Sequence, residues 1–338
     1  MQNNKLKENT LESKYVCTIC GHQAKKMYSG MKGYMEGLTY DVIACTNCDT
    51  SYVDPLEAKD EIYEHIYRQV DKVPGYERYY RYASVMKKVG NPLKLLANSE
   101  SAYWAVNDVL EKSYTNKNVS ILEVGSGLGY LTYALNKAGY TTVGLDISED
   151  AISKAKKAYG DYYKADDLFR LAKVQTEHYD CIIMMEVIEH VENPTAFIEA
   201  ALSLLAPGGK LIMTTPNKTA TPPGTIWHSD FPPVHLWFFA EKTLQYIANK
   251  LNRTCEFVDF TEYSKKFYSP QYAGDIEKIQ IGLPRLDVNG DVRSEVVVEH
   301  TKTKIFGLRL RFFLSYIRRR FMKKEVSSRS TTQCVVLS

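Results

Sequence analysis

The chain has 338 residues, of which 44% are apolar, enough for one full α/β core and a smaller module besides. Its 43 basic and 40 acidic residues nearly balance, so overall charge gives no reason to expect a nucleic acid as partner. No stretch reaches about 18 uncharged apolar residues, and the start of the chain lacks the apolar segment of a secretion signal. We therefore expect a cytoplasmic protein without transmembrane helices. The sequence specifies no oligomeric state.

Two pairs of cysteines lie near the start of the chain. Cys17 and Cys20 form the first pair, and Cys45 and Cys48 form the second. Each Cys-x-x-Cys turn directs two thiolates to one side, and two such turns complete the tetrahedral shell that Zn²⁺ prefers. We predict a zinc ribbon over residues 1–54 with a structural metal, because four thiolates leave no coordination position open. The alternative is four reduced cysteines without a metal.

Residues 55–115 are rich in Tyr, Lys and Glu at helical spacing and are interrupted twice by proline. This pattern predicts two or three helices that connect the ribbon to the next unit. The Tyr- and Arg-rich run 76–82 is suited to cap a cofactor pocket. Alternatively, it forms an amphipathic helix that packs on the core.

A short apolar strand that begins near Val119 runs into a glycine-rich turn, and a helix follows. The candidate ligand-binding positions of this turn are Gly125, Ser126, Gly127 and Gly129. Glycines let the backbone approach a ligand closely and leave the helix N-terminus open. The spacing is G-x-G-x-G and not the G-x-G-x-x-G of dinucleotide enzymes, and the acid Glu123 precedes it. This departure favours S-adenosylmethionine (SAM), whose ammonium group suits a nearby carboxylate.

Acids at the ends of three later strands extend the predicted cofactor site. Asp146 ends the second strand, where a carboxylate can accept both ribose hydroxyls, and Ile147 follows it. Asp166, or Asp167 if not Asp166, follows the third strand and is suited to the adenine amino group. Glu186 ends a continuous apolar strand that is typical of a sheet covered on both faces.

The strands and helices alternate regularly over residues 116–300. This order predicts an α/β fold, a Rossmann-like and mainly parallel sheet with helices on both faces, preceded by the ribbon and the connecting helices.

Three longer motifs point to a family. E-V-G-S-G-L-G, Y-D-C-I-I-M-M-E-V-I-E-H-V and L-L-A-P-G-G-K-L-I-M-T-T-P-N resemble those of class I SAM-dependent methyltransferases, over roughly residues 100–260. Within that class the chain is most similar to the branch of the ubiquinone-biosynthesis O-methyltransferases. The cysteine ribbon resembles that of bacterial members, some of them encoded with glycan genes. The resemblance implies SAM as cofactor and leaves the methyl acceptor open.

Methyl transfer to a hydroxyl requires alignment of the acceptor and removal of a proton. His190 lies one turn after the fourth strand, at the edge where such sheets bind ligands, and is the predicted base, with Glu189 beside it. The alternative is a histidine that caps or packs a helix.

A second hypothesis concerns the same segment. Glu-x-x-Glu-His with the later His235 resembles the metal-binding set of small-RNA 2′-O-methyltransferases, which implies a second divalent ion and an RNA ribose as acceptor. A third hypothesis is a non-catalytic SAM-binding scaffold or regulator.

The stretch 216–239 is dense in Pro, Trp and His and follows the fifth strand, so we expect it to cover the active site. The candidate acceptor contacts are Trp227, His228, His235 and Trp237. Trp237 could instead pack against the helix that follows. We predict a small-molecule acceptor, a hydroxyl or amine of a sugar or glycan precursor.

Residues 301–338 form a tail. Its first part, 301–324, combines nine basic residues with many apolar ones and has no acid, so it is suited to an anionic membrane surface or a lipid-linked acceptor. Alternatively, it packs on the domain. We expect the last residues to be disordered.

Overall fold

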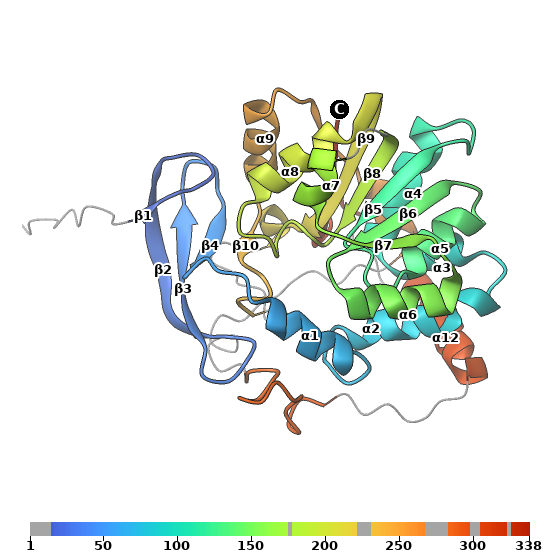
Figure 1. Cartoon of the computed structure of the whole chain (residues 1–338), viewed down its shortest axis with the longest axis horizontal. Helices are drawn as coiled ribbons and strands as arrows, with labels where there is room; N and C mark the ends of the chain where they lie inside the picture. Colours follow the sequence, from blue (N-terminus) through green and yellow to red (C-terminus); the bar gives the residue numbers. More distant parts are fainter. Residues whose placement is uncertain (1–14, 175–177, 222–230, 268–282, 298–304, 323–325) are drawn as a thin grey trace, which may run out of the picture.

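The computed structural model describes residues 15–174, 178–221, 231–267, 283–297, 305–322 and 326–338. It contains two sheets, a small one formed mainly by the start of the chain and a large one covered by helices (Figure 1). The small sheet is antiparallel, with the strand order β1-β2-β3-β4-β10. Its strands are β1 (Tyr15–Val16), β2 (Gln23–Lys32), β3 (Thr39–Cys45), β4 (Ser51–Asp54) and β10 (Trp237–Phe238).

The large sheet has seven strands in the order β11-β12-β9-β8-β5-β6-β7. The five strands from β9 to β7 in this order run parallel to one another, and β12 and β11 are added antiparallel at one edge. The strands are β5 (Ser120–Val124), β6 (Thr141–Asp146), β7 (Tyr163–Ala165), β8 (Tyr179–Met185), β9 (Leu205–Pro216), β11 (Cys255–Phe257) and β12 (Thr332–Leu337).

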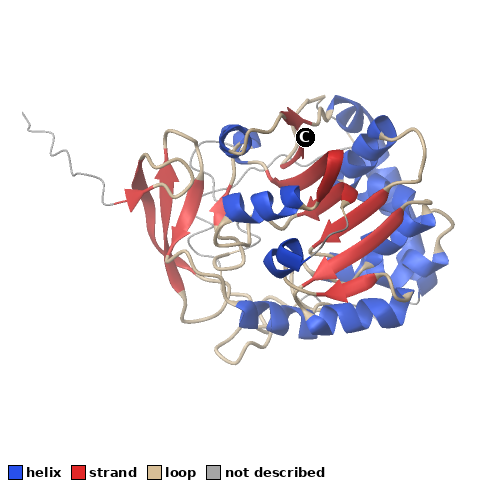
Figure 2. Cartoon of the chain, turned by 45° about the horizontal axis from the view of Figure 1, so that its top comes forward, coloured by secondary structure: helices blue, strands red, loops and turns tan. Residues whose placement is uncertain are grey.

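Helices cover both faces of the large sheet (Figure 2). In one group α3 contacts both α4 and α5, and another group pairs α7 with α8. The α-helices are α1 (Asp60–Arg68), α2 (Glu77–Val85), α3 (Pro92–Ser99), α4 (Ser101–Ser113), α5 (Tyr130–Lys137), α6 (Glu149–Tyr159), α7 (Leu168–Val174), α8 (Pro194–Ser203), α9 (Glu241–Lys250), α10 (Thr261–Lys266) and α12 (Ile305–Phe321). Short 3₁₀ turns lie at Met86–Lys88 and Lys218–Ala220. The predicted α/β class is confirmed.

The strand order creates a crevice between β5 and β8. From β5 the chain proceeds outward to β6 and β7, and it then returns to the other side of β5 for β8 and β9. At such a switch point the connections leave in opposite directions, so the carboxyl ends of the two central strands border an open space. The apolar residues 181–184 of β8 are fully buried, as expected for a strand with helices on both sides. The crevice therefore borders the buried core of the large sheet.

The small sheet is not closed by the first 54 residues alone. β10 comes from the segment after β9 and pairs with β4, with Trp237 opposite Tyr52. The hydroxyl of Thr243 on α9 donates to the backbone oxygen of Cys48 at 2.8 Å, and Lys218 pairs with Asp49 at 2.7 Å. The ribbon is thus joined to the α/β unit by backbone and side-chain bonds.

The end of the chain differs from the prediction. The expectation of a disordered end was wrong, because Thr332–Leu337 forms β12, inserted between β9 and β11 of the large sheet. Cys334, Val335 and Leu337 are almost completely buried there. The strand satisfies backbone groups of two neighbours at once, which local sequence does not reveal. Among the described helices, none is both long and apolar enough to cross a membrane.

Candidate functional site

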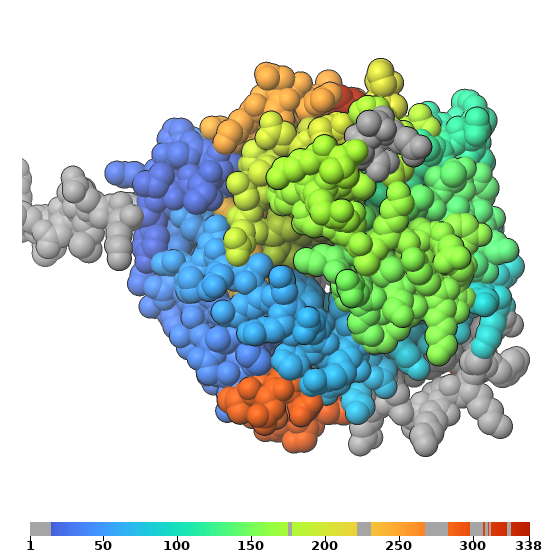
Figure 3. All heavy atoms as spheres, viewed as in Figure 1, coloured from blue at the N-terminus to red at the C-terminus, as the bar shows by residue number. Residues whose placement is uncertain are grey.

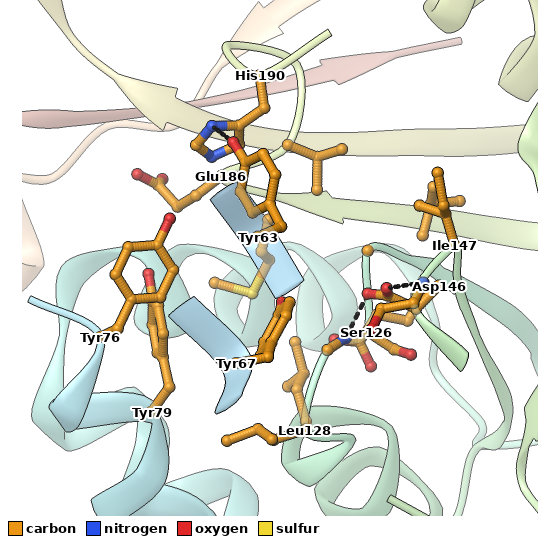
Figure 4. A pocket seen from close by; sticks show the side chains of 18 of the residues that line it. Tyr63, Tyr67, Tyr76, Tyr79, Ser126, Leu128, Asp146, Ile147, Glu186 and His190 are labelled. Carbon is orange, nitrogen blue, oxygen red and sulfur yellow. Dashed lines mark hydrogen bonds between the residues drawn. The ribbon is translucent and has the colours of Figure 1, made fainter. Parts of the chain in front are cut away.

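A cavity of about 1810 Å³ lies at the carboxyl ends of β5, β6 and β8. Helices α1 and α2 border it on one side, and the glycine-rich turn after β5 borders it on the other (Figure 4). In the space-filling view, the surface is hollowed where light-blue residues of the connecting helices meet green residues of the α/β unit (Figure 3). The cavity thus occupies the crevice that the strand order creates.

The glycine-rich turn needs glycine for two reasons. Gly125, Gly127 and Gly129 all have positive φ angles, which side chains rarely adopt. A Cβ at Gly129 would come within 2.6 Å of the Tyr163 ring, and one at Gly125 within 2.5 Å of Val187. The turn therefore keeps its backbone open to the cavity, and α5 begins directly after it.

Asp146 holds the glycine-rich turn from the end of β6. One carboxylate oxygen accepts from the backbone N–H of Gly127 at 2.7 Å, and the other accepts from Ser148 at 2.9 Å. Each oxygen keeps further acceptor capacity for a ligand hydroxyl. The side chain is only 8% exposed, and burial raises its pKa, which its two backbone bonds lower in part. Ile147, next to it in the wall of the cavity, is 66% exposed.

Two further predicted cofactor residues line the same cavity. The Ser126 hydroxyl oxygen is buried and has no hydrogen-bond partner among the described residues. Asp166 lies after β7, and its carboxylate pairs with Arg170 at 2.5 Å. A buried hydroxyl that lacks a protein partner is costly unless a ligand or water satisfies it. The turn and its surroundings therefore fit a ligand with both donors and acceptors.

Glu123 differs from the open carboxylate that the sequence suggested. It borders the cavity but is only 4% exposed, and the Thr132 hydroxyl on α5 donates to it. Burial raises the pKa of this carboxyl to about 8, although the hydrogen bonds from Thr132 lower it in part. Burial thus favours the protonated form of Glu123, and its bond from Thr132 holds α5 against β5.

The segment after β8 brings His190 to the cavity. It starts at Glu186, whose φ of 53° turns the chain out of the strand, and both side chains line the cavity. His190 Nδ1 lies 2.5 Å from the backbone oxygen of Val234 and 2.9 Å from the Tyr63 hydroxyl. A carbonyl oxygen can only accept, so Nδ1 carries the proton. The other nitrogen, Nε2, is then the proton acceptor of this ring.

Glu189, His190 and His235 come together although His235 lies far along the chain. Their ligand atoms lie within 4.8 Å of one another, and Glu189 and His235 are buried. The backbone oxygen of Glu189 accepts from Leu236 at 2.8 Å, and the oxygen of Leu236 accepts from Val53 in β4 at 3.0 Å. The donor set of one carboxylate and two imidazoles is one that divalent transition metals accept. The segment that carries His190 is thus linked to the ribbon through Leu236.

The structure adds tyrosines that the sequence analysis did not single out. Tyr63 and Tyr67 of α1 line the cavity, four residues apart on one face of the helix. The Tyr67 hydroxyl lies 3.0 Å from where a Cβ on Gly127 would be, so it covers the glycine-rich turn. Tyr76 and Tyr79, from the run predicted to cap the pocket, complete this wall. The i, i+4 spacing of the first two was the available signal.

The predicted acceptor contacts are only partly placed. Trp227 and His228 lie outside the described residues. His235 is described, but it is buried and does not line the cavity, so its expected role as an acceptor contact was wrong. Trp237 does not line the cavity: it is fully buried in β10, its ring contacts Tyr52, and its indole N–H donates to Val191 at 2.8 Å. Its expected role as an acceptor contact was wrong, because the side chain is buried between the ribbon and the large sheet.

The four cysteines of the ribbon also come together, away from the cavity. All four sulfurs lie within 4.8 Å of one another. Cys17 and Cys48 are 3.6 Å apart, and Cys20 and Cys45 are 3.5 Å apart. A tetrahedral zinc with Zn–S bonds of about 2.3 Å separates its sulfurs by about 3.8 Å. The cluster therefore fits one zinc ion with little change.

Comparisons with known proteins identify the family of the chain. A family model described as a methyltransferase domain matches residues 86–256, half of the chain. The ubiquinone biosynthesis O-methyltransferase of Coxiella burnetii is 36% identical over 114 residues, covering 32% of this chain and 48% of that protein. Its counterpart in Xanthomonas oryzae pv. oryzae is 34% identical over 104 residues, covering 29% and 44%. The chain thus spans about half the length of these curated relatives.

Solved structures of two methyltransferases are also similar. The plantazolicin methyltransferase BpumL, in complex with SAH, has a TM-score of 0.41 at 14% identity, covering 82% of this chain and 98% of that one. The magnesium protoporphyrin IX methyltransferase of Synechocystis, with bound SAH, has a TM-score of 0.40 at 18% identity, covering 59% and 91%. Both scores are low, so the assignment depends on the match in sequence. By that match, the chain belongs to the methyltransferase domain family.

Proposed function

We propose that the cavity binds SAM and that the chain catalyses transfer of its methyl group to a hydroxyl or amine of a small molecule. One observation supports this most strongly. The glycine-rich turn, Asp146 and His190 line the same cavity, with the cofactor-type residues on one wall and a proton acceptor on another. SAM supplies an activated methyl group, so the protein must mainly orient the acceptor and take up a proton.

The volume of the cavity supports two ligands side by side. Typical small-molecule pockets measure roughly 300–1,000 Å³, and this cavity holds about 1810 Å³. A cofactor on the glycine-rich turn leaves space below α1 and α2. Tyr63, Tyr76 and Tyr79 border that space.

Within this space His190 is the proposed base. Its ring is held by the bonds at Nδ1, so Nε2 is the nitrogen that would accept the proton of the acceptor hydroxyl. Tyr63 acts as a positioning residue, because its hydroxyl meets both Nδ1 and the Val234 oxygen.

A sugar or glycan precursor is the proposed acceptor class, since the wall combines tyrosines with Arg78 and offers both flat apolar faces and hydrogen-bonding groups. The curated relatives are named for ubiquinone biosynthesis, which makes a phenolic hydroxyl the nearest competitor. A screen with methyl-labelled SAM over nucleotide sugars, catechols and RNA distinguishes these acceptors. Calorimetry with S-adenosylhomocysteine (SAH) tests cofactor binding separately. Tight SAH binding without transfer to any acceptor would favour the non-catalytic scaffold.

A second candidate adds a divalent ion beside the acceptor. The specific observation is the cluster of Glu189, His190 and His235, whose donor set fits such an ion. In this case EDTA abolishes transfer, Mg²⁺ or Mn²⁺ restores it, and Glu189→Ala and His235→Ala are as damaging as His190→Ala. With His190 as a metal-free base, EDTA has little effect. The zinc content must be checked after chelation, since the ribbon can also lose its metal.

We also propose that the four cysteines hold one structural Zn²⁺. The sulfur separations support this, and a closed shell of four thiolates has no position for a substrate.

A further inference from the structure

Within the part of the chain that the structure describes, one face of helix α12 is exposed. Four apolar residues are strongly exposed, namely Leu310 at 46%, Phe313 at 58%, Leu314 at 54% and Phe321 at 82%. Their spacing of three, one and seven residues places them on one stripe of the helix. Removing such apolar surface from water lowers the free energy, so these side chains favour a partner that covers them. We call these four residues the apolar stripe.

The opposite face of α12 is anchored to the protein. Phe312 stacks on Tyr82 of α2 with ring centres 5.5 Å apart, and Tyr316 contacts Phe267 at 5.8 Å. Arg319 donates to the backbone oxygen of Asn98 at 3.0 Å and also to the Tyr263 hydroxyl. Because these contacts hold the inner face, the apolar stripe points outward as part of a fixed surface.

Positive charge accompanies the apolar stripe. Arg318 and Arg320 are exposed and lie in the last turn of α12, between Leu314 and Phe321. The segment 301–324 contains nine basic residues and no acid. A protein partner with an ordinary mixed surface would not select such one-sided charge. An apolar stripe with arginines beside it matches a bilayer surface, where acyl chains lie below anionic head groups.

We propose that α12 docks the protein on an anionic phospholipid bilayer, lying flat with the apolar stripe inserted and the arginines at the head groups. The length and composition of the helix agree with binding at the surface and not with crossing. This inference is independent of the proposed methyl transfer.

Docking in this orientation has a consequence for the cavity. Arg319, on the inner face of α12, lines the main cavity and also a neighbouring cavity of about 770 Å³ between α12, α2 and α3. Ser99 and Glu100 border both as well. Helix α12 would therefore lie between the bilayer and the cavity, and an amphiphilic molecule held in the membrane would be close to the site.

Vesicle flotation of the full chain tests the proposal. We compare vesicles of phosphatidylcholine alone with vesicles that also contain phosphatidylglycerol. The wild type should bind the anionic vesicles, and high salt should weaken binding. Phe313→Glu combined with Leu314→Glu should reduce binding by at least about tenfold, since two inserted side chains are lost. Arg318→Glu with Arg320→Glu should reduce binding to anionic vesicles only.

A matched control places the same charges elsewhere. Val174 and Val326 are 65% and 62% exposed and lie outside α12, so Val174→Glu with Val326→Glu should bind vesicles as the wild type does. Circular dichroism checks that each variant is folded. SAH affinity checks separately that the proposed cofactor site is intact.

Two results would overturn the proposal. One is equal vesicle binding by the wild type and the Phe313→Glu, Leu314→Glu variant. The other is a wild type that does not bind vesicles and forms a dimer in solution, while the Phe313→Glu, Leu314→Glu variant is monomeric. In that case a second copy of the chain covers the apolar stripe.

Discussion

Asp146 allows a direct test of the cofactor site. Its two oxygens accept from Gly127 and Ser148, and each oxygen retains a lone pair for a ligand hydroxyl. Asp146→Ala removes both backbone bonds and both ligand contacts. Asp146→Asn keeps one acceptor oxygen, and its amide group faces a backbone N–H that also donates.

The magnitudes follow from these contacts. A hydrogen bond to a charged group contributes about 1.5–3 kcal/mol. Losing two ligand bonds should lower SAH affinity about 100-fold in Asp146→Ala, and losing one should lower it about tenfold in Asp146→Asn. Two buried backbone amides also lose their acceptor in the alanine variant, so its free energy of unfolding should fall by about 3 kcal/mol.

Isothermal titration calorimetry with SAH measures the affinities, and urea unfolding followed by circular dichroism measures the stabilities. The control is Asp108→Asn on α4, which removes a surface pair with Lys112 outside the cavity and should leave SAH affinity unchanged. The reasoning is refuted if Asp146→Asn is folded and binds SAH as tightly as the wild type. An effect on stability alone would assign Asp146 to the fold and not to the ligand.

Three further predictions concern the ribbon, a buried acid and the base. Elemental analysis should find one zinc per chain, lost in Cys17→Ser or Cys45→Ser; a folded, zinc-free wild type would contradict the ribbon. Burial raises the pKa of Glu123 from 4.5 to about 8, so the folded protein keeps a proton that the unfolded chain releases, and the free energy of unfolding should fall as pH rises across this range. The melting temperature, measured between these two pH values, should therefore decline less steeply with pH in Glu123→Gln than in the wild type. An equal slope in both proteins would reject the raised pKa of Glu123. His190→Ala should lower turnover by roughly 10²- to 10⁴-fold with SAH affinity near wild type, whereas full activity would exclude His190 as base.

Local sequence determined the parts of the site that lie within one strand and the turn after it. The glycine spacing before α5 and the acid at the end of β6 each occupy a few consecutive residues. Because the turn after a parallel strand lies at the ligand-binding edge of the sheet, Asp146 and Gly125 could be predicted to border the cavity without knowing what packs around them. The two cysteine pairs are similarly local, and the structure brings them together as the spacing predicted.

Tertiary structure decided what depends on partners far along the chain. Tyr63 meets His190 across 127 residues, and β12 fills a slot between two strands that precede it. Trp237 lies in β10, which pairs with β4, so its side chain is buried away from the cavity. A short polar-flanked run such as 332–337 has no periodicity that separates a buried strand from a loose end. Its backbone groups have partners on both sides only in the folded sheet, between β9 and β11, and its own residues do not carry that information.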